Sequence, residues 1–203
     1  MREDNTVGSR GVLSQRQKEI LVGTLLGDAH LELTGRYSRL RVDHQNAQKD
    51  YVLWKAKELE PFSLTPREIS ETDRRSGKTY KRWHFSTRSL PIFTEFRNLF
   101  YVNRKKVIPK NIEKVMTSLS LAVWFMDDGF RRRDSKGFYL CTSSFTSREQ
   151  GVLQKMLLDR FGLETKIHHQ RKLERIFVPS AFADKFNAVV KPFIHPVFRY
   201  KLL

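Results

Sequence analysis

The 203-residue chain contains a single cysteine, Cys141, and this scarcity limits the classes of protein that it can encode. One thiol cannot build an intramolecular disulfide framework, and unpaired cysteine is typical of a reducing compartment. No Cys/His spacing resembles a structural zinc site, and the adjacent His168 and His169 have poor ligand geometry. We therefore expect an intracellular protein, cytoplasmic or organellar, without a disulfide or zinc framework.

The chain also lacks an apolar run of transmembrane length and a charged-then-apolar signal at its N-terminus. These absences predict that no membrane is involved. Residues 1–13 are polar, with Gly8 and Gly11, and are expected to form a flexible N-terminal arm.

Acidic residues are the third shortage, with 22 Asp and Glu against 38 Lys and Arg, a net charge of +16. Such an excess favours a polyanionic partner. A basic peripheral membrane protein is the alternative, but it would concentrate its charge on one amphipathic helix, whereas here the charge spreads over several segments. Hydrophobic residues make up 39% of the chain, enough for one large domain or two small ones.

One local pattern occurs twice. Residues 21–29 read LVGTLLGDA and residues 121–129 read LAVWFMDDG, so each apolar run delivers one carboxylate, Asp28 or Asp128. The segments that follow each copy also alternate in the same order. This duplication predicts two half-sites that face each other across a pseudo-twofold axis.

Hydrophobic periodicity and turn residues predict an α+β fold of two αββαββα lobes, each an antiparallel sheet backed by helices. The N-terminal lobe spans 14–101, with helices at 14–27, 47–60 and 90–101 and hairpins at 30–46 and 66–88. A connector covers 102–117. The C-terminal lobe spans 118–203, with helices at 118–127, 146–161 and 180–190 and hairpins at 130–145 and 164–178. Ser14 with Gln17, and Thr146 with Glu149, form expected capping boxes.

An aspartate at the C-terminal end of a helix meets the negative end of the macrodipole, at a cost of about 0.3–1 kcal/mol. Two such residues lying close together also repel, and a divalent cation would relieve both penalties because hard cations take oxygen ligands. Paired carboxylates under a basic surface suit metal-dependent phosphodiester hydrolysis. Alternatively, each Asp is an ordinary turn residue after a buried helix. Asp127 is expected to be a supporting or solvated group and not a ligand.

Both nine-residue segments resemble the LAGLIDADG motif, and nearly the whole chain, from Ser14 to Leu203, resembles the monomeric two-motif LAGLIDADG homing endonucleases. The resemblance implies that the eighth motif positions, Asp28 and Asp128, bind the catalytic Mg²⁺, with Mn²⁺ or Ca²⁺ able to substitute for binding. It also implies motif helices at the lobe interface and saddle-shaped sheets in the DNA major groove. The implied reaction is cleavage of a long, nearly unique duplex site with 3′ overhangs.

The sequence departs from the motif in two places. Ala29 replaces glycine at the ninth position of the first copy, and Val123 occupies the third position of the second copy. Gly23 and Gly27 allow a close helix approach in the first copy only, so we expect an asymmetric interface.

The resemblance also implies catalytic roles for one lysine in each lobe, Lys106 before an Ile-Pro pair and Lys201 near the C-terminus. They would hold water and neutralise charge near the scissile phosphates, or they are surface lysines that contact phosphate. One amide from each sheet, Gln45 and Gln170, is expected to approach the reacting water, with base readout as the competing role.

Basic residues alternate with apolar ones in all four hairpins, and period-two alternation turns one set outward, where Arg and Gln can read base edges. A solvated charged face is the alternative. The predicted DNA-contacting residues are Arg36, Arg39, Arg41, Arg74, Arg75, Lys78, Lys81, Arg82, Arg131, Arg133, Lys136, His168, Gln170, Lys172 and Arg175. The aromatic residues at helical spacing are expected in the core; they are Phe96, Phe100, Trp124, Phe125, Phe161 and Phe186.

These observations favour a Mg²⁺-dependent, site-specific double-strand DNA endonuclease that acts as a monomer. The alternatives are an intron RNA maturase or a non-cleaving DNA-binding regulator on the same scaffold, and intron RNA is a second candidate partner. A more distant alternative is a metal-independent binder of structured RNA. Retention of both Asp28 and Asp128 favours the enzyme, because a protein that had lost cleavage would have no need of them.

Overall fold

The structure is a computed structural model that describes residues 11–170 and 173–203; residues 1–10 of the expected arm and Lys172 lie outside this range. The chain forms two compact units. The first comprises the chain up to Lys18 and Ala29–Asn98, and the second comprises Glu19–Asp28 and Leu99–Leu203. Helix α1 (Gln15–Leu26) is continuous, and its larger part belongs to the second unit.

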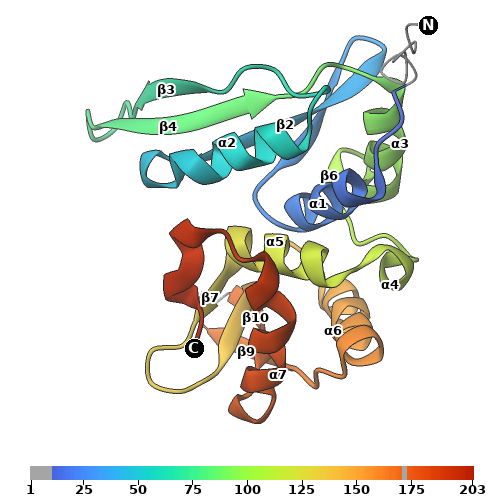
Figure 1. The fold of residues 1–203 in the computed structure, drawn as a ribbon, viewed down its shortest axis with the longest axis vertical. Coiled ribbons are helices and arrows are strands. Elements are labelled where there is room, and N and C mark those ends of the chain that lie inside the picture. Colours follow the sequence, from blue (N-terminus) through green and yellow to red (C-terminus); the bar gives the residue numbers. More distant parts are fainter. Residues whose placement is uncertain (1–10, 171–172) are drawn as a thin grey trace, which may run out of the picture. The chain divides into compact units, whose positions relative to one another are not determined.

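The first unit holds a four-stranded antiparallel sheet in the order β1-β2-β4-β3. Its elements are β1 (His30–Thr34), β2 (Tyr37–Gln45), the 3₁₀ turn η2 (Asn46–Gln48), α2 (Lys49–Glu58), β3 (Arg67–Thr72), β4 (Thr79–Ser86) and α3 (Pro91–Phe100), of which Leu99 and Phe100 fall in the second unit. Helix α2 lies against β2 and β4 (Figure 1). The opposite face of the sheet is therefore left for other contacts.

The second unit repeats this topology with a four-stranded sheet in the order β7-β8-β10-β9. Its elements are the short strands β5 (Tyr101–Val102) and β6 (Lys105–Lys106), α4 (Ile112–Val115), α5 (Ser118–Asp128), β7 (Gly129–Arg131), β8 (Phe138–Cys141), α6 (Ser147–Phe161), β9 (Lys166–Gln170), β10 (Leu173–Val178), α7 (Ser180–Val190), η3 (Lys191–Phe193) and η4 (Pro196–Lys201). Helix α5 contacts β8 and α7, and α7 contacts β10.

The predicted αββαββα order is confirmed in both halves, and so is the α+β class with two antiparallel sheets. Both capping boxes form: Gln17 N donates to Ser14 Oγ at 3.2 Å, and Glu149 N donates to Thr146 Oγ1 at 3.3 Å. The expectation of a plain connector at 102–117 was incomplete, because the β5–β6 hairpin and α4 occupy it.

Glycines in α1 allow it to pack closely against α5 within the second unit. A Cβ at Gly23 would lie 2.4 Å from Ser120 O, and a Cβ at Gly27 would lie 2.4 Å from Asp127 Cβ. Both distances are shorter than real Cβ contacts allow, so only glycine fits. The expected close approach through the first motif copy is therefore confirmed.

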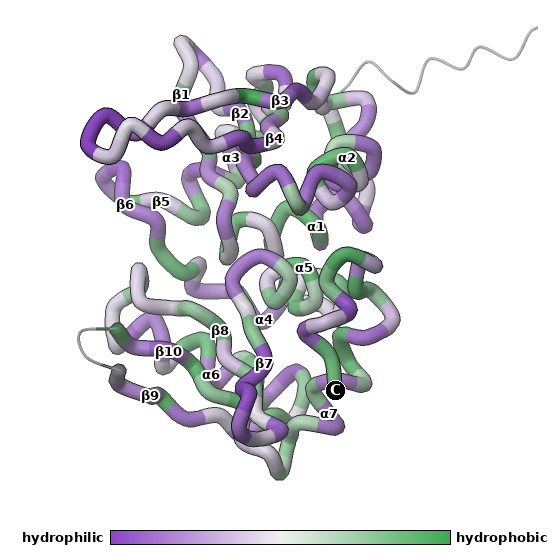
Figure 2. Tube along the Cα trace, turned by 90° about the vertical axis from the view of Figure 1, so that its left-hand side faces the viewer, coloured by the Kyte–Doolittle hydropathy of each residue, from purple (hydrophilic) through white to green (hydrophobic). Residues whose placement is uncertain are grey.

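Helix α5 is the buried centre of the second unit and is coloured hydrophobic along most of its length (Figure 2). Residues 121–126 are all buried, and the Phe125 ring meets Phe138 and Phe186 edge to face. Of the aromatic residues expected in the core, Phe100, Trp124, Phe125 and Phe186 are buried, while Phe96 and Phe161 are only half-buried. In the part of the chain that the structure describes, no helix has the length and apolar character needed to cross a membrane.

Candidate active site

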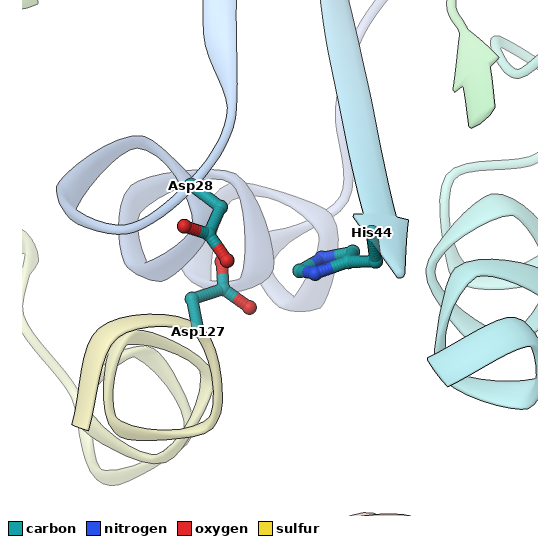
Figure 3. A group of neighbouring side chains, drawn as sticks. All are labelled: Asp28, His44 and Asp127. Carbon is teal, nitrogen blue, oxygen red and sulfur yellow. The ribbon is translucent and has the colours of Figure 1, made fainter. Parts of the chain in front are cut away.

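Two carboxylates meet where the motif helices end. Gly27 N still donates to Gly23 O at 3.1 Å, and Asp28 follows as an exposed residue. Asp127 lies in the last turn of α5, and its carboxylate comes within 4.8 Å of that of Asp28 (Figure 3). Oxygen ligands at this separation suit a hard divalent cation, and the exposure of Asp28 leaves the pair open to a phosphate.

Asp128, the last residue of α5, faces a different direction from Asp127, because successive helical residues are rotated by about 100°. Its charge acts most strongly on groups elsewhere in the unit. Among the three aspartates, Asp128 does most to raise the pKa of Lys106, and it also raises the pKa of the Cys141 thiol. The end of α5 therefore presents two carboxylates to two sets of neighbours.

Lys106 places its ammonium at the C-terminal end of α1. Its Nζ donates to Gly27 O at 3.1 Å, and its side chain is half-buried on β6. Burial lowers the pKa of Lys106 below its ordinary value, and the charges of Asp128, Asp127 and Asp28 oppose that shift. A cation at this position is favourable because the last carbonyl groups of a helix carry partial negative charge.

Lys201 does the same for α5. Its Nζ donates to Met126 O at 2.6 Å and to Phe125 O at 3.3 Å, and only 7% of the residue is exposed. Burial lowers the pKa of Lys201, and Asp127 is the charge that most opposes the shift, followed by Asp28 and Asp128. The Phe198 ring lies 4.7 Å from the ammonium, so Lys201 is held on several sides.

Each motif helix thus ends in one or two carboxylates and a buried ammonium that caps its carbonyl groups. The arrangement can bind a cation through the carboxylates and neutralise anionic charge through the lysines. The structure brings together Asp28, Asp128, Lys106 and Lys201 of the predicted site, and it adds Asp127, which the sequence argument had set aside. The contact of Gly27 with Asp127 was a usable signal, because a glycine one residue before Asp28 allows a partner side chain to come close.

The two predicted amides lie at strand ends. Gln45 is the exposed last residue of β2, and the backbone of Gln170 ends β9, although its side chain is outside the described part. His44, also labelled in Figure 3, precedes Gln45 on the buried side of β2. Within its own unit, its Nε2 lies 3.3 Å from Lys55 Nζ and its ring packs on Tyr51.

The predicted arginines of β2 point away from α2. Arg39 Nε donates to Glu32 Oε1 at 2.5 Å, and Arg41 Nε donates to Asp43 Oδ2 at 3.1 Å. Asp43 in turn lies 3.0 Å from His84 Nδ1 across the strand pair. These ion pairs hold the guanidinium groups in place above the sheet before any ligand arrives.

Two predicted basic residues fall on the helix-covered side of their sheets. Lys81 is next to Arg82 in β4 and therefore faces the opposite way, where it pairs with Glu68 at 2.9 Å. Arg131 pairs with Phe138 in the strand register, and its Nη1 donates to Leu202 O at 3.0 Å. Arg82 stays on the open face and pairs with Glu71.

The open face of the second sheet holds two of the predicted residues, His168 and Arg175, and one that the sequence argument missed, Arg132. The guanidinium of Arg132 lies 5.7 Å from the Phe177 ring centroid, and that of Arg175 lies 5.5 Å from the Phe130 centroid. Counting alternate positions from Phe130 would have found Arg132. The remaining predicted basic residues, apart from Lys172, are exposed in the hairpin turns; they are Arg36, Arg74, Arg75, Lys78, Arg133 and Lys136.

The sequence profile of the LAGLIDADG DNA endonuclease family matches residues 18–186. The fold, the doubled motif and this match define the class of protein. The chain belongs to the LAGLIDADG DNA endonuclease family.

Relatives of known name cover nearly the whole chain. DNA endonuclease I-ChuI of Chlamydomonas applanata is 30% identical over 94% of this chain and 95% of its own length. The cytochrome b mRNA maturase bI2 of Debaryomyces hansenii is 29% identical over 94% of this chain and 74% of its own. The solved structure of the homing endonuclease I-WcaI bound to its DNA recognition sequence superposes with a TM-score of 0.88, at 27% identity, covering 96% of this chain and 88% of that one.

Proposed function

We propose that this chain is a homing endonuclease that cuts both strands of one long, nearly unique duplex DNA site and leaves 3′ overhangs. The observation that carries the proposal is the doubled arrangement at the motif-helix ends, where carboxylates of Asp28, Asp127 and Asp128 lie with the buried ammonium groups of Lys106 and Lys201. The similarity to I-ChuI and to DNA-bound I-WcaI supports it.

The acids are the proposed ligands of Mg²⁺, with Asp28 and Asp128 contributing one from each motif and Asp127 lying beside Asp28. Carboxylate oxygens are the ligands that this ion prefers, and Mn²⁺ or Ca²⁺ would take the same donors. When bound, the ion would polarise the scissile phosphate and stabilise the leaving oxygen. One unit of chain carries all three acids, so the proposed enzyme acts as a monomer.

The lysines are proposed to neutralise charge at each scissile phosphate. An approaching phosphate favours the protonated form of a nearby lysine, which offsets the lowering of the pKa by burial. Because Gly27 O and Met126 O hold the two ammonium groups in position, little reorganisation is needed when the substrate binds. Gln45 and Gln170 are proposed to orient the attacking water, one from each sheet.

A second candidate function is intron RNA maturation, which the similarity to the maturase bI2 favours. It does not require the acids, so the two functions make different predictions for the same variants.

The test is cleavage of a randomised duplex library by purified protein, with Mg²⁺ and with EDTA, followed by sequencing of the cut ends. Magnesium-dependent cuts at one long motif with a constant 3′ stagger are expected. Selective retention of duplexes without any cutting would overturn the endonuclease, and splicing of an intron RNA that survives Asp28→Asn would favour the maturase.

A further inference from the structure

The open faces of the two sheets have different chemistry. In the first sheet, β2 presents Arg39, Arg41, Asp43 and Gln45, which are charged or amide side chains. In the second sheet, the corresponding face is built from aromatic rings. Phe138 packs on Phe125 and Phe186 on the helix side, so the alternate residue Tyr139 lies on the open side.

Four rings from four different strands form one continuous cluster on this open face; they are Phe130 of β7, Tyr139 of β8, Phe177 of β10 and His168 of β9. Tyr139 is central, with ring centroids 5.0 Å from Phe130 and 4.9 Å from Phe177. His168 stacks on Phe177 at 4.2 Å, and its Nδ1 lies 3.0 Å from the Tyr139 hydroxyl. The strand register sets these neighbours, because Phe130 pairs with Tyr139 and Tyr139 with Phe177.

The cluster borders a hollow of about 640 Å³ that is open to solvent, and Phe130 remains 36% exposed. Arg132 and Arg175 line the same hollow, each with its guanidinium over a ring of the cluster. An exposed apolar surface flanked by two cations is suited to a ligand that has apolar groups between phosphates.

In the major groove, the 5-methyl group of thymine is the one apolar group that a base pair presents, and phenylalanine is among the side chains that contact it. A polar face such as that of β2 instead reads base edges through hydrogen bonds. The difference between the two faces therefore predicts a difference between the two halves of the target site.

We infer that the second sheet reads its half of the DNA site through thymine methyl groups, with Phe130 and Tyr139 as the contacting residues and Arg132 and Arg175 on the flanking phosphates. The inference rests on the proposed function, because it requires that the open sheet faces lie against duplex DNA. It adds which bases each half of the site must contain: thymines on the side of β7–β10, and hydrogen-bonding edges without a methyl requirement on the side of β1–β4.

Stacking of unpaired RNA bases is the other use of exposed aromatic residues. Stacking needs an open ring face. Here the ring of Phe130 stacks on Tyr139 and also carries Arg175, while the ring of Phe177 contacts Tyr139, His168 and Arg132. The rings are already engaged with one another, so the cluster favours contact with a small methyl group over insertion of a base.

The test uses the unaltered protein and chemically altered DNA. The target site recovered from the random library is synthesised with deoxyuridine in place of thymidine in one half or the other, which removes only the methyl groups. Affinity is measured by competition in EDTA, so that cleavage does not interfere. A buried methyl group contributes about 0.8 kcal/mol, which is roughly a fourfold change in affinity for each contacted thymine. We expect that loss in one half of the site and little change in the other.

Two variants connect the effect to the cluster. Phe130→Ala should abolish the preference for thymine over uracil in the sensitive half, whereas Phe130→Leu, which keeps an apolar surface, should retain most of it. Arg39→Ala, on the open face of the first sheet, should alter base preference in the insensitive half and leave the thymine preference intact.

Equal affinity for the thymine and uracil forms of both halves would overturn the inference while leaving the endonuclease in place. Persistence of the full preference in Phe130→Ala would overturn the assignment to this cluster. If Phe130→Ala instead weakened binding of single-stranded RNA, the rings would be a stacking surface. Absence of any sequence-selective duplex binding would overturn the proposed function and this inference together.

Discussion

Lys201 Nζ lies 2.6 Å from the carbonyl oxygen of Met126, inside the last turn of the helix that carries Asp127 and Asp128. A helix end that bears acidic side chains is electrostatically unfavourable, and a buried cation on the free carbonyl groups offsets this cost. Lys106 makes the equivalent contact with Gly27 O next to Asp28. The lysines therefore stabilise the positions of the acids as well as supplying charge for the proposed reaction.

Replacement of either lysine by methionine should impair cleavage more than binding. Loss of one positioned donor near developing negative charge typically lowers the rate by about 10²–10³-fold. We expect a loss of this size in Lys201→Met, measured by single-turnover cleavage of the target, with a much smaller change in affinity. Lys191→Met removes an exposed lysine of the same unit and should retain the parent rate. Equal activity of the two variants would contradict the role of Lys201.

Substitution of the packing glycines should destabilise the protein. A Cβ at Gly27 would lie 2.4 Å from Asp127 Cβ, so Gly27→Ala forces α1 and α5 apart, at an expected cost of about 1–3 kcal/mol in the free energy of unfolding. Gly151→Ala is the matched control. Its Cβ meets no atom within 4 Å in the middle of α6, and alanine there should stabilise the protein by about 0.5–1 kcal/mol. Urea denaturation measures both, and a neutral Gly27→Ala would refute the close packing.

Cys141 should react slowly with iodoacetamide at neutral pH. Burial raises the pKa of its thiol above the ordinary value, and the charge of Asp128 raises it further, whereas Arg175 and Lys201 oppose the shift. Because only the thiolate reacts, the rate should climb as the pH rises toward that elevated pKa. Asp128→Asn should lower the pKa and accelerate alkylation at a given pH. A rate that does not respond to Asp128→Asn would show that the carboxylate does not face Cys141.

His168 should remain neutral at pH 7. Partial burial lowers its pKa below the usual value of 6.5, and the charges of Arg132, Lys166 and His169 lower it further. Between that lowered pKa and 6.5, the unfolded chain binds more protons at this residue than the folded chain does. The contribution of His168 to stability therefore rises with pH through this window and falls as the pH decreases. An NMR titration of the imidazole should give a midpoint below 6.5 that increases in Arg132→Gln, and a midpoint above 6.5 would contradict this environment.

Much of the fold follows from the sequence, because helix caps, turn glycines and strand alternation are local signals. Gly162 ends α6 with a φ of +59°, as a glycine after a capped helix predicts. The β5–β6 hairpin was missed because two-residue strands have no periodicity. Its backbone turns through Asn103 and Arg104, both with positive φ, which their residue types do not announce.

The candidate site was only partly predictable. Motif position identifies Asp28 and Asp128, but nothing in the local sequence says which carboxylate of the Asp127-Asp128 pair turns toward Asp28. That depends on the rotation of α5 against α1, which tertiary packing at Gly23 and Gly27 determines. The aromatic cluster also escaped the sequence argument, because its four rings come from four strands whose pairing is not a local property.

The central claim is that the acids at the motif-helix ends perform DNA cleavage. Its most direct test is strand-resolved cleavage of the recovered target in Mg²⁺ by the parent protein and by Asp28→Asn and Asp128→Asn, with binding measured in parallel and Asp127→Asn for comparison. The account predicts that neither Asp28→Asn nor Asp128→Asn makes double-strand breaks, although both still bind the site with the parent's sequence preference. Double-strand cleavage at the parent rate by either variant would contradict it.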